Sequence, residues 1–149
     1  MYKHILITTD GSELARKGIE HGLALARPLG ARVTILTVLP PVRSEEMAEA
    51  SRIGGIDNPV AYYDHQIDEA MKERFAAIEH LVSAHDVKAE LAHEIDRSPA
   101  EAIVRFAQHK GCDLIVMSSH GRRGVQRVLL GSQTAEVLAH TTIPVLVVR

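Results

Sequence analysis

Ile5-Leu6-Ile7-Thr8-Thr9-Asp10-Gly11-Ser12 is the stretch that decides the fold, because it passes from a strand to a helix within a few residues. Its first five residues are apolar or β-branched, which is typical of a strand buried on both faces of a sheet. Asp10-Gly11 then breaks the strand. Ser12 is a good N-cap for a following helix, with acidic Glu13 in the first turn. We expect this helix to run as far as Pro28 and Gly30.

The same alternation of strands and helices continues along the chain. Further strands are expected over residues 33–39, 87–95, 114–117 and 144–148. Helices are expected over residues 62–85, from Ser98 onwards and over residues 132–140. Ser98 would be an N-cap, and Glu101 would complete a capping box. This alternation predicts a Rossmann-like α/β fold in one domain, residues 1–149. Its single open sheet has five parallel strands in the order 3-2-1-4-5, with helices on both faces.

Residues 42–60 interrupt the alternation. They are largely polar and carry Gly54-Gly55 and Asn58-Pro59 as turn signals. One or two helical turns fit within residues 45–51. A connection of this length in a compact domain is usually functional or mobile.

The composition excludes several classes of protein. Aromatic residues make up 3% of the chain and tryptophan is absent, so stacking platforms for single-stranded nucleic acid are scarce. A formal net charge of −2 does not indicate a polyanion-binding protein. Cys112 is the only cysteine, so no intramolecular disulfide can form. No apolar run approaches the roughly 20 residues that span a bilayer. We expect a cytoplasmic protein with neither nucleic-acid nor membrane partners.

Candidate binding residues gather where the strands end. Ligands of an open parallel sheet bind beyond the carboxyl ends of the strands, where the strand order reverses. These ends carry Thr8-Thr9-Asp10, Val38 and Met117-Ser118-Ser119-His120-Gly121. The last segment continues through Arg122-Arg123-Gly124 to Gly131-Ser132-Gln133-Thr134, where a helix starts.

Residues 118–134 have the features of an anion-binding segment. Glycines bring backbone amides close to phosphate oxygens, and a helix amino terminus favours a phosphate. Hydroxyl donors and positive charges accompany them: Ser118, Ser132, Thr134, Arg122, Arg123 and Arg127. The alternative is a glycine-rich connection with solvated arginines, and an acidic residue before glycine, as at Asp10, is also common turn chemistry.

The pattern Ser118-x2-Gly121-x9-Gly131-Ser132 resembles the ATP-binding motif of universal stress proteins, Gly-x2-Gly-x9-Gly-Ser/Thr. Other segments resemble further signatures of that family in the same order: Ile5–Ser12, Ser98–Ile103, Asp113–Arg122 and Pro144–Val148. Together they span essentially the whole chain. The resemblance implies an adenine nucleotide alpha hydrolase-like fold. It also implies a stress-response regulatory protein that binds ATP, ADP or AMP, with Mg²⁺ as a candidate accompanying ion.

The resemblance also implies roles for individual residues. Asp10 would meet the polar side of the nucleoside, and the Val38 backbone would face the adenine. The phosphates and ribose would be held by Gly121, Gly131, Ser132, Gln133 and Thr134. The full candidate set is Thr8, Thr9, Asp10, Val38, Met117, Ser118, His120, Gly121, Arg122, Arg123, Gly124, Gly131, Ser132, Gln133 and Thr134. Ser118 stands where the family's ATP binders usually have glycine, so it can either crowd the phosphates or donate to them.

Other motifs give little support to other functions. The chain lacks Gly-x-Gly-x-x-Gly after its first strand, Gly-x4-Gly-Lys-Ser/Thr and Gly-x-Ser-x-Gly, which argues against dehydrogenases, P-loop NTPases and α/β-hydrolases. The nine histidines show no zinc-type spacing, so we predict solvated surface histidines and no metal site. His120 is the exception, because it would touch phosphate or orient the loop. We predict that Cys112 is a small structural residue.

Two rival functions stay open. One is a dimeric interaction scaffold that has lost nucleotide binding, for which Ser118 is the supporting feature. The other is a slow ATPase with Asp10 as the one obvious carboxylate near the phosphates; we expect no catalytic residues and at most weak hydrolysis. The last strand should lie at one side of the sheet, and an apolar edge invites a second copy. We therefore predict a homodimer through Val145, Leu146, Val147 and Val148.

Overall fold

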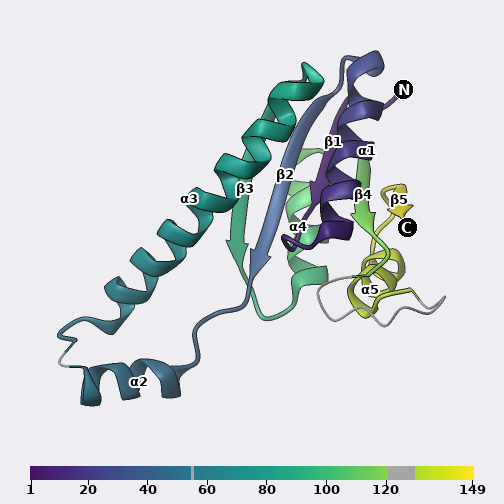
Figure 1. Ribbon diagram of the computed structural model, residues 1–149. Helices are drawn as coiled ribbons and strands as arrows, with labels where there is room; N and C mark the ends of the chain where they lie inside the picture. Colours follow the sequence, from purple (N-terminus) through teal and green to yellow (C-terminus); the bar gives the residue numbers. More distant parts are fainter. Residues whose placement is uncertain (55, 121–129) are drawn as a thin grey trace.

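The computed structural model describes residues 1–54, 56–120 and 130–149 (Figure 1). One sheet has the strand order β3-β2-β1-β4-β5, and all neighbouring strands are parallel. Its strands are β1 (His4–Thr8), β2 (Arg32–Leu39), β3 (Ala89–Ile95), β4 (Leu114–Ser118) and β5 (Val145–Val148). The predicted fold class and strand order are confirmed.

Two pairs of helices cover the sheet. The helices are α1 (Glu13–Leu29), α2 (Ser44–Ile53), α3 (Pro59–His85), α4 (Pro99–Lys110) and α5 (Ser132–His140). One core joins α1 and α3 to one face of the sheet, and includes Ile7, Leu23 and Ile78. A second core joins α4 and α5 to the other face, and includes Leu6, Phe106 and Val137. Because side chains of β1 belong to both cores, the strand is buried on both faces, as its sequence predicts.

The turn from β1 into α1 is set by local chemistry. The Ser12 hydroxyl accepts a hydrogen bond from the Ala15 amide at 3.1 Å, which confirms the predicted N-cap. Gly30 ends the helix in the left-handed conformation, with φ of 61°. In the middle of α1, a Cβ built on Gly22 would lie 2.8 Å from Ile7 Cγ1. Glycine at this position therefore lets α1 pack closely against β1.

Residues 42–60 are more helical than the sequence suggested. The expected one or two turns are a ten-residue helix, α2, and α3 begins at Pro59 rather than near Tyr62. The Asn58 side chain caps α3 by accepting from the Ala61 amide at 3.2 Å, and proline suits the first helical turn. Figure 1 shows α2 and the start of α3 projecting beyond the carboxyl end of the sheet.

The start of α4 differs from the predicted capping box. The Ser98 side chain makes no capping hydrogen bond. Instead, Gln133 Oε1 in α5 accepts from the Ala100 amide at 3.1 Å. The prediction was wrong because a side chain from a distant part of the chain satisfies this amide.

Exposed apolar side chains occur on the projecting helices and on an edge strand. Ile53, Val60 and Tyr62 belong to α2 and the start of α3, and Leu146 belongs to the edge strand β5. None of the helices in the described ranges has the length and apolar character needed to cross a membrane.

Candidate functional site

The candidate site lies where the connections leave the sheet in opposite directions. β1 and β4 are neighbours at the centre of the sheet. After β1 the chain enters α1 on one face, and after β4 it enters α5 on the other face. Ile7 pairs with Val116, so Thr8–Asp10 and Met117–Ser119 lie side by side at the carboxyl ends of these strands. This divergence is the position at which open parallel sheets bind their ligands.

The turn after β1 holds a carboxylate at this edge. Thr8 and Thr9 are buried, and Asp10 is partly exposed. Asp10 Oδ1 accepts a hydrogen bond from the Ser12 amide at 2.9 Å, while Thr9 Oγ1 accepts from the Gly11 amide at 3.2 Å. Gly11 has φ of 79°, a conformation that favours glycine. The turn therefore places the Asp10 carboxylate at the carboxyl end of β1.

Hydrogen bonds made by its own side chains hold the segment at the end of β4. The Ser118 hydroxyl donates to the His120 carbonyl at 3.0 Å. Ser119 Oγ lies 2.8 Å from His120 Nδ1, at hydrogen-bond distance. His120 Nε2 is buried, and no described residue offers it a hydrogen bond. The imidazole is thus fixed at one nitrogen and keeps hydrogen-bonding capacity at the other.

Helix α5 is anchored to the end of β4. The Gly131 amide donates to the Ser119 carbonyl at 2.6 Å, and the buried Thr134 hydroxyl donates to the Ser118 carbonyl at 2.9 Å. A Cβ on Gly131 would lie 2.8 Å from that same Ser119 oxygen, so a larger residue would push the two segments apart. These contacts hold the amino terminus of α5 beside the end of β4.

Ser119 lies in the candidate segment 117–121 but was left out of the full candidate set, yet it connects three elements. It is buried, its amide donates to the Val148 carbonyl of β5 at 2.8 Å, and its carbonyl accepts from Gly131. The only sequence signal for this role is its place between Ser118 and His120, directly after a strand. Its contacts depend on residues that follow much later in the chain.

The remaining predicted residues fall into three groups. Ser132 and Gln133 are exposed in the first turn of α5, where the backbone amides have no intrahelical acceptor. Val38 lies near the carboxyl end of β2 and is partly buried, while the Met117 side chain belongs to the core with α4 and α5. Four predicted residues lie outside the described residues: Gly121, Arg122, Arg123 and Gly124.

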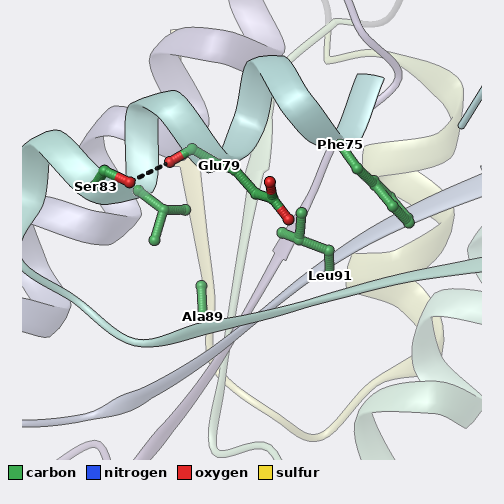
Figure 2. Close-up of a pocket in the computed structure, with 6 residues that line it drawn as sticks. Phe75, Glu79, Ser83, Ala89 and Leu91 are labelled. Carbon is green, nitrogen blue, oxygen red and sulfur yellow. Dashed lines mark hydrogen bonds between the residues drawn. The ribbon is translucent and has the colours of Figure 1, made fainter. Parts of the chain in front are cut away.

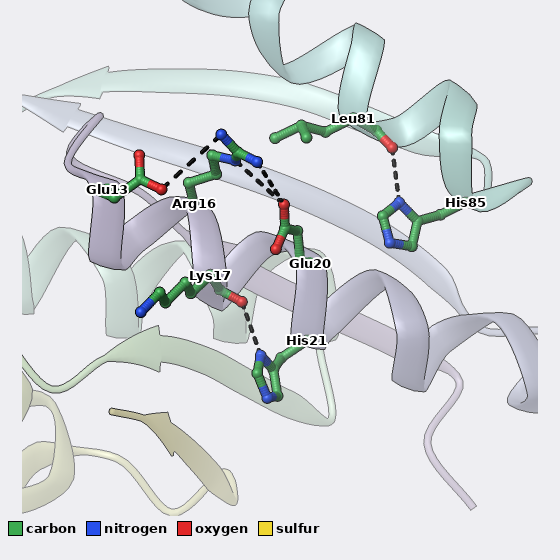
Figure 3. Close-up of polar contacts among 7 residues, drawn as sticks. All are labelled: Glu13, Arg16, Lys17, Glu20, His21, Leu81 and His85. Atoms are coloured by element: carbon green, nitrogen blue, oxygen red, sulfur yellow. Dashed lines mark hydrogen bonds and ion pairs between the residues drawn. The ribbon is translucent and has the colours of Figure 1, made fainter.

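Three histidines on the helices contact the backbone of their own helix. His21 Nδ1 lies 3.0 Å from the Lys17 carbonyl oxygen in α1, and His85 Nδ1 lies 2.8 Å from the Leu81 carbonyl oxygen in α3. Figure 3 shows both contacts. His140 makes the same contact with the Glu136 carbonyl in α5. No grouping of three or more His, Cys, Asp or Glu side chains suited to a metal ion occurs within the described part of the chain.

Two residues at the opposite end of the sheet are structural. Cys112 is buried, as expected for a small structural residue, and burial together with the nearby Asp113 carboxylate raises the pKa of its thiol to about 11. His4 is also buried, and its Nε2 lies 2.9 Å from Thr34 Oγ1 in β2. Burial and the positive charge of Arg32 lower the pKa of His4.

Open depressions lie along the sheet in the described part of the chain. A groove of about 470 Å³ lies between α3 and β3, and its lining residues are Phe75, Glu79, Val82, Ser83, Ala89 and Leu91. Figure 2 shows how these side chains line it. It includes the amino end of β3, and its side chains are mostly apolar, so it lacks converging phosphate donors. A smaller pocket of about 210 Å³ lies at the carboxyl end of β2, where Leu39, Pro40 and Val42 face Tyr63, Ile67 and Met71 of α3. Only the second pocket adjoins the carboxyl edge of the sheet.

Comparisons with known proteins agree on one family. The model of the universal stress protein family matches residues 1–149. Universal stress protein MJ0531 of Methanocaldococcus jannaschii is 31% identical, over all of this chain and 83% of that protein. The solved structure of hypothetical protein MJ0577 is 30% identical with a TM-score of 0.74, covering 99% of this chain and 96% of that chain.

More distant solved structures share the fold. One is a universal stress protein in complex with cAMP, at 21% identity and a TM-score of 0.67, covering 99% of this chain and 97% of that chain. Another is the Archaeoglobus fulgidus universal stress protein in complex with dAMP, at 20% identity and a TM-score of 0.67, covering 99% and 98%.

Proposed function

The chain belongs to the universal stress protein family, and from this premise we propose that it binds an adenine nucleotide and acts as a stress-response regulator. The observation that carries the proposal is the meeting of three groups at one edge of the sheet. These are the Asp10 carboxylate, the Ser118–His120 segment and the amino terminus of α5. A carboxylate suits ribose hydroxyls, whereas helix-terminal amides suit phosphates.

The nucleoside is proposed to lie across the ends of β1 and β2. The backbone of Val38 would face the adenine, and Asp10 would accept hydrogen bonds from the ribose. The pocket between Leu39 and Met71 supports this placement, because its lining is largely apolar and it opens beside the end of β2. Shared fold with proteins solved in complex with cAMP and dAMP adds support for an adenine ligand.

The phosphates are proposed to lie at the amino terminus of α5. The amides of Ser132, Gln133 and Thr134 belong to the first turn, which carries the positive end of the helix dipole. Gly121, Arg122, Arg123 and Gly124 would complete the cradle, with ATP as the preferred ligand and Mg²⁺ bridging its phosphates.

The contacts of Ser118 support binding despite the missing glycine. Its hydroxyl donates to the His120 carbonyl and its carbonyl accepts from Thr134. The side chain is therefore engaged within its own segment. We expect it to shape the segment rather than crowd a phosphate.

Calorimetric titration of nucleotide-free protein tests the proposal. ATP, ADP and AMP are added separately, each with and without Mg²⁺. Because Asp10→Asn removes the charge at the site, it should weaken binding at least about tenfold, as expected for loss of a hydrogen bond to a charged group. Asp86→Asn is the matched control, because Asp86 caps α3 in a left-handed conformation that asparagine also accepts. If none of the three nucleotides binds at millimolar concentration, the proposal fails, and a scaffold without ligand becomes the better account.

We also propose a cytoplasmic homodimer paired through β5. The strand lies at the edge of the sheet, and Leu146 is exposed on it. An unpaired apolar edge favours association with a second copy. Release or binding of nucleotide would then alter contacts with a partner protein through residues 42–60, which join the end of β2 to α3.

A further inference from the structure

The helices that follow β2 form a projection with little core of its own. We use "acidic arm" for residues 44–53 and 56–69, which are α2, the three residues before α3 and the first part of α3. None of these residues is buried, and the first buried residue of α3 is Met71. Most helical stability in proteins comes from packing an apolar face. A projecting helix pair that buries so little is therefore a surface available to a partner.

The acidic arm exposes large apolar side chains. Ile53 at the end of α2 is 71% exposed, Val60 is 53% exposed and Tyr62 is 43% exposed. The ring of Tyr62 packs edge-on against Tyr63, with centroids 5.4 Å apart, and the Tyr63 hydroxyl donates to the Glu46 carbonyl of α2 at 3.3 Å. The Tyr63–Glu46 hydrogen bond joins the start of α3 to α2. Both helices project from the same end of the sheet (Figure 1).

The acidic arm is strongly negative. It has seven acidic residues and one basic residue, Arg52, whereas the whole chain has a formal charge of only −2. Glu69 forms an ion pair with Lys72 at 2.7 Å. Among the described residues, the other six acids make no ion pair: Glu45, Glu46, Glu49, Asp57, Asp64 and Asp68. Asp64 and Asp68 are one helical turn apart, a like-charge spacing that disfavours the isolated helix.

We propose that the acidic arm docks a basic amphipathic segment of a partner protein. The apolar side chains of that segment would cover Ile53, Val60 and Tyr62, and its lysines and arginines would face the unpaired carboxylates. Complementary charge accelerates encounter and selects the partner, while the apolar contacts supply affinity.

Docking is separable from nucleotide binding. The base of the acidic arm adjoins the pocket at the end of β2, where Tyr63 and Ile67 face Val42. A nucleotide bound in that region would therefore change how the partner docks, and this statement alone rests on the proposed function. The docking itself is tested without nucleotide, so its failure is distinguishable from the failure of nucleotide binding.

Fluorescence anisotropy with a labelled amphipathic peptide of leucine and lysine tests the proposal, and the same peptide with glutamate replacing lysine is its control. We expect the lysine peptide to bind the full-length protein and the glutamate peptide not to bind. Combined Glu45→Lys, Glu49→Lys and Asp64→Lys should weaken binding at least about tenfold, and added salt should weaken it in the same direction.

Two sets of matched variants distinguish binding at the acidic arm from general effects of net charge and of exposed apolar side chains. Glu13→Lys, Glu79→Lys and Glu101→Lys make the same change in net charge outside the acidic arm, and should leave binding within about twofold. Ile53→Ser with Tyr62→Ser should weaken binding, whereas Ile95→Ser with Leu138→Ser, exposed elsewhere, should not. Circular dichroism confirms that each variant is folded. Absence of binding at about 100 µM peptide (a Kd far above the micromolar range), equal losses in both charge sets, or self-association through the acidic arm in place of peptide binding would overturn the proposal.

Discussion

His4 illustrates how a single buried side chain makes the fold sensitive to pH. It is 6% exposed at the start of β1, and its Nε2 contacts Thr34 Oγ1. Nδ1 is buried, and within the described ranges it has no hydrogen-bond partner. Burial and the charge of Arg32 lower the pKa of His4 from its ordinary value of 6.5. The imidazole is therefore neutral in the folded protein near neutral pH.

This shift predicts that the protein loses stability in mild acid. Below pH 6.5 the unfolded chain binds a proton at His4, while the folded chain does not until the pH reaches its lower folded pKa. Stability is therefore fully present above pH 6.5 and falls as the pH drops towards that folded value. Urea unfolding at pH 7.5 and about pH 5.5 should show a smaller decrease for His4→Gln than for the wild type.

The matched control for this prediction is His65→Gln, because His65 is exposed on α3. Its decrease in stability between the two pH values should equal that of the wild type. If His4→Gln and the wild type lose the same free energy of unfolding, burial of His4 does not govern the acid sensitivity.

Local sequence predicts some residue environments and not others. Cys112 precedes an apolar strand, and its buried, inert character follows from that position. His4 stands near the polar start of the chain. Its burial comes from pairing with Arg32 in β2 and packing on Thr34, which are distant in sequence. The role of Ser119 was missed for the same reason, because its partners belong to β5 and the start of α5.

At the scale of elements, two glycines on α1 should respond oppositely to alanine. A Cβ on Gly22 would contact Ile7 Cδ1 and lie 2.8 Å from Ile7 Cγ1, and Ile7 is fully buried. Gly22→Ala should therefore destabilise the protein by about 1–3 kcal/mol through overpacking. A Cβ on Gly18 would meet only the Ser118 amide at 3.8 Å, an ordinary contact. Gly18→Ala should stabilise by about 0.5–1 kcal/mol through helix propensity. Urea unfolding checks both variants, and stability changes of the same sign would contradict the packing described for α1.

The cap of α4 gives a second prediction at this scale. Gln133 accepts from the Ala100 amide, whereas the Ser98 side chain makes no capping bond. Gln133→Ala should therefore destabilise by about 1 kcal/mol, the usual value of a cap, and Ser98→Ala should change stability by less than about half of that. Thermal unfolding in the absence of nucleotide separates this effect from ligand binding. A larger loss of stability for Ser98→Ala than for Gln133→Ala would show that Ser98 caps the helix, as the capping box predicted.

The elements themselves were largely predictable. The strands and helices follow from apolar periodicity, from Ser12 as a cap and from turn signals at Gly30 and Asn58-Pro59. The length of α2 was underestimated, because a helix with no buried residue has no apolar stripe to reveal it. The glycine motif that includes Gly131 predicted the start of α5. The hydrogen bonds that join this helix start to Ser118 and Ser119 could not be predicted, because they form only in the folded sheet.

At the scale of the whole molecule, the proposed dimer depends on the free edge of β5. The carbonyls of Pro144 and Val148 accept from amides of Ile115 and Ser119, so these residues face β4. Backbone direction alternates along a strand, so the backbone groups of Val147 face outwards. Val147→Pro should therefore keep the fold, because edge strands tolerate proline where the amide points away from the sheet.

Light scattering after gel filtration checks this dimer. The wild type should have twice the chain mass of 16.3 kDa, and Val147→Pro should have the mass of one chain. A wild-type protein that stays monomeric at micromolar concentration would contradict the proposed dimer through β5.

The central claim is that an adenine nucleotide binds where β1 and β4 end and α5 begins. The most direct measurement is a residue-resolved NMR titration of labelled protein with ATP and Mg²⁺. We predict saturable shifts at the amides of Asp10, Val38, His120 and Ser132, with little change at Glu79 and Leu91 in the groove between α3 and β3. Shifts centred on that groove, or none at millimolar ATP, would contradict it.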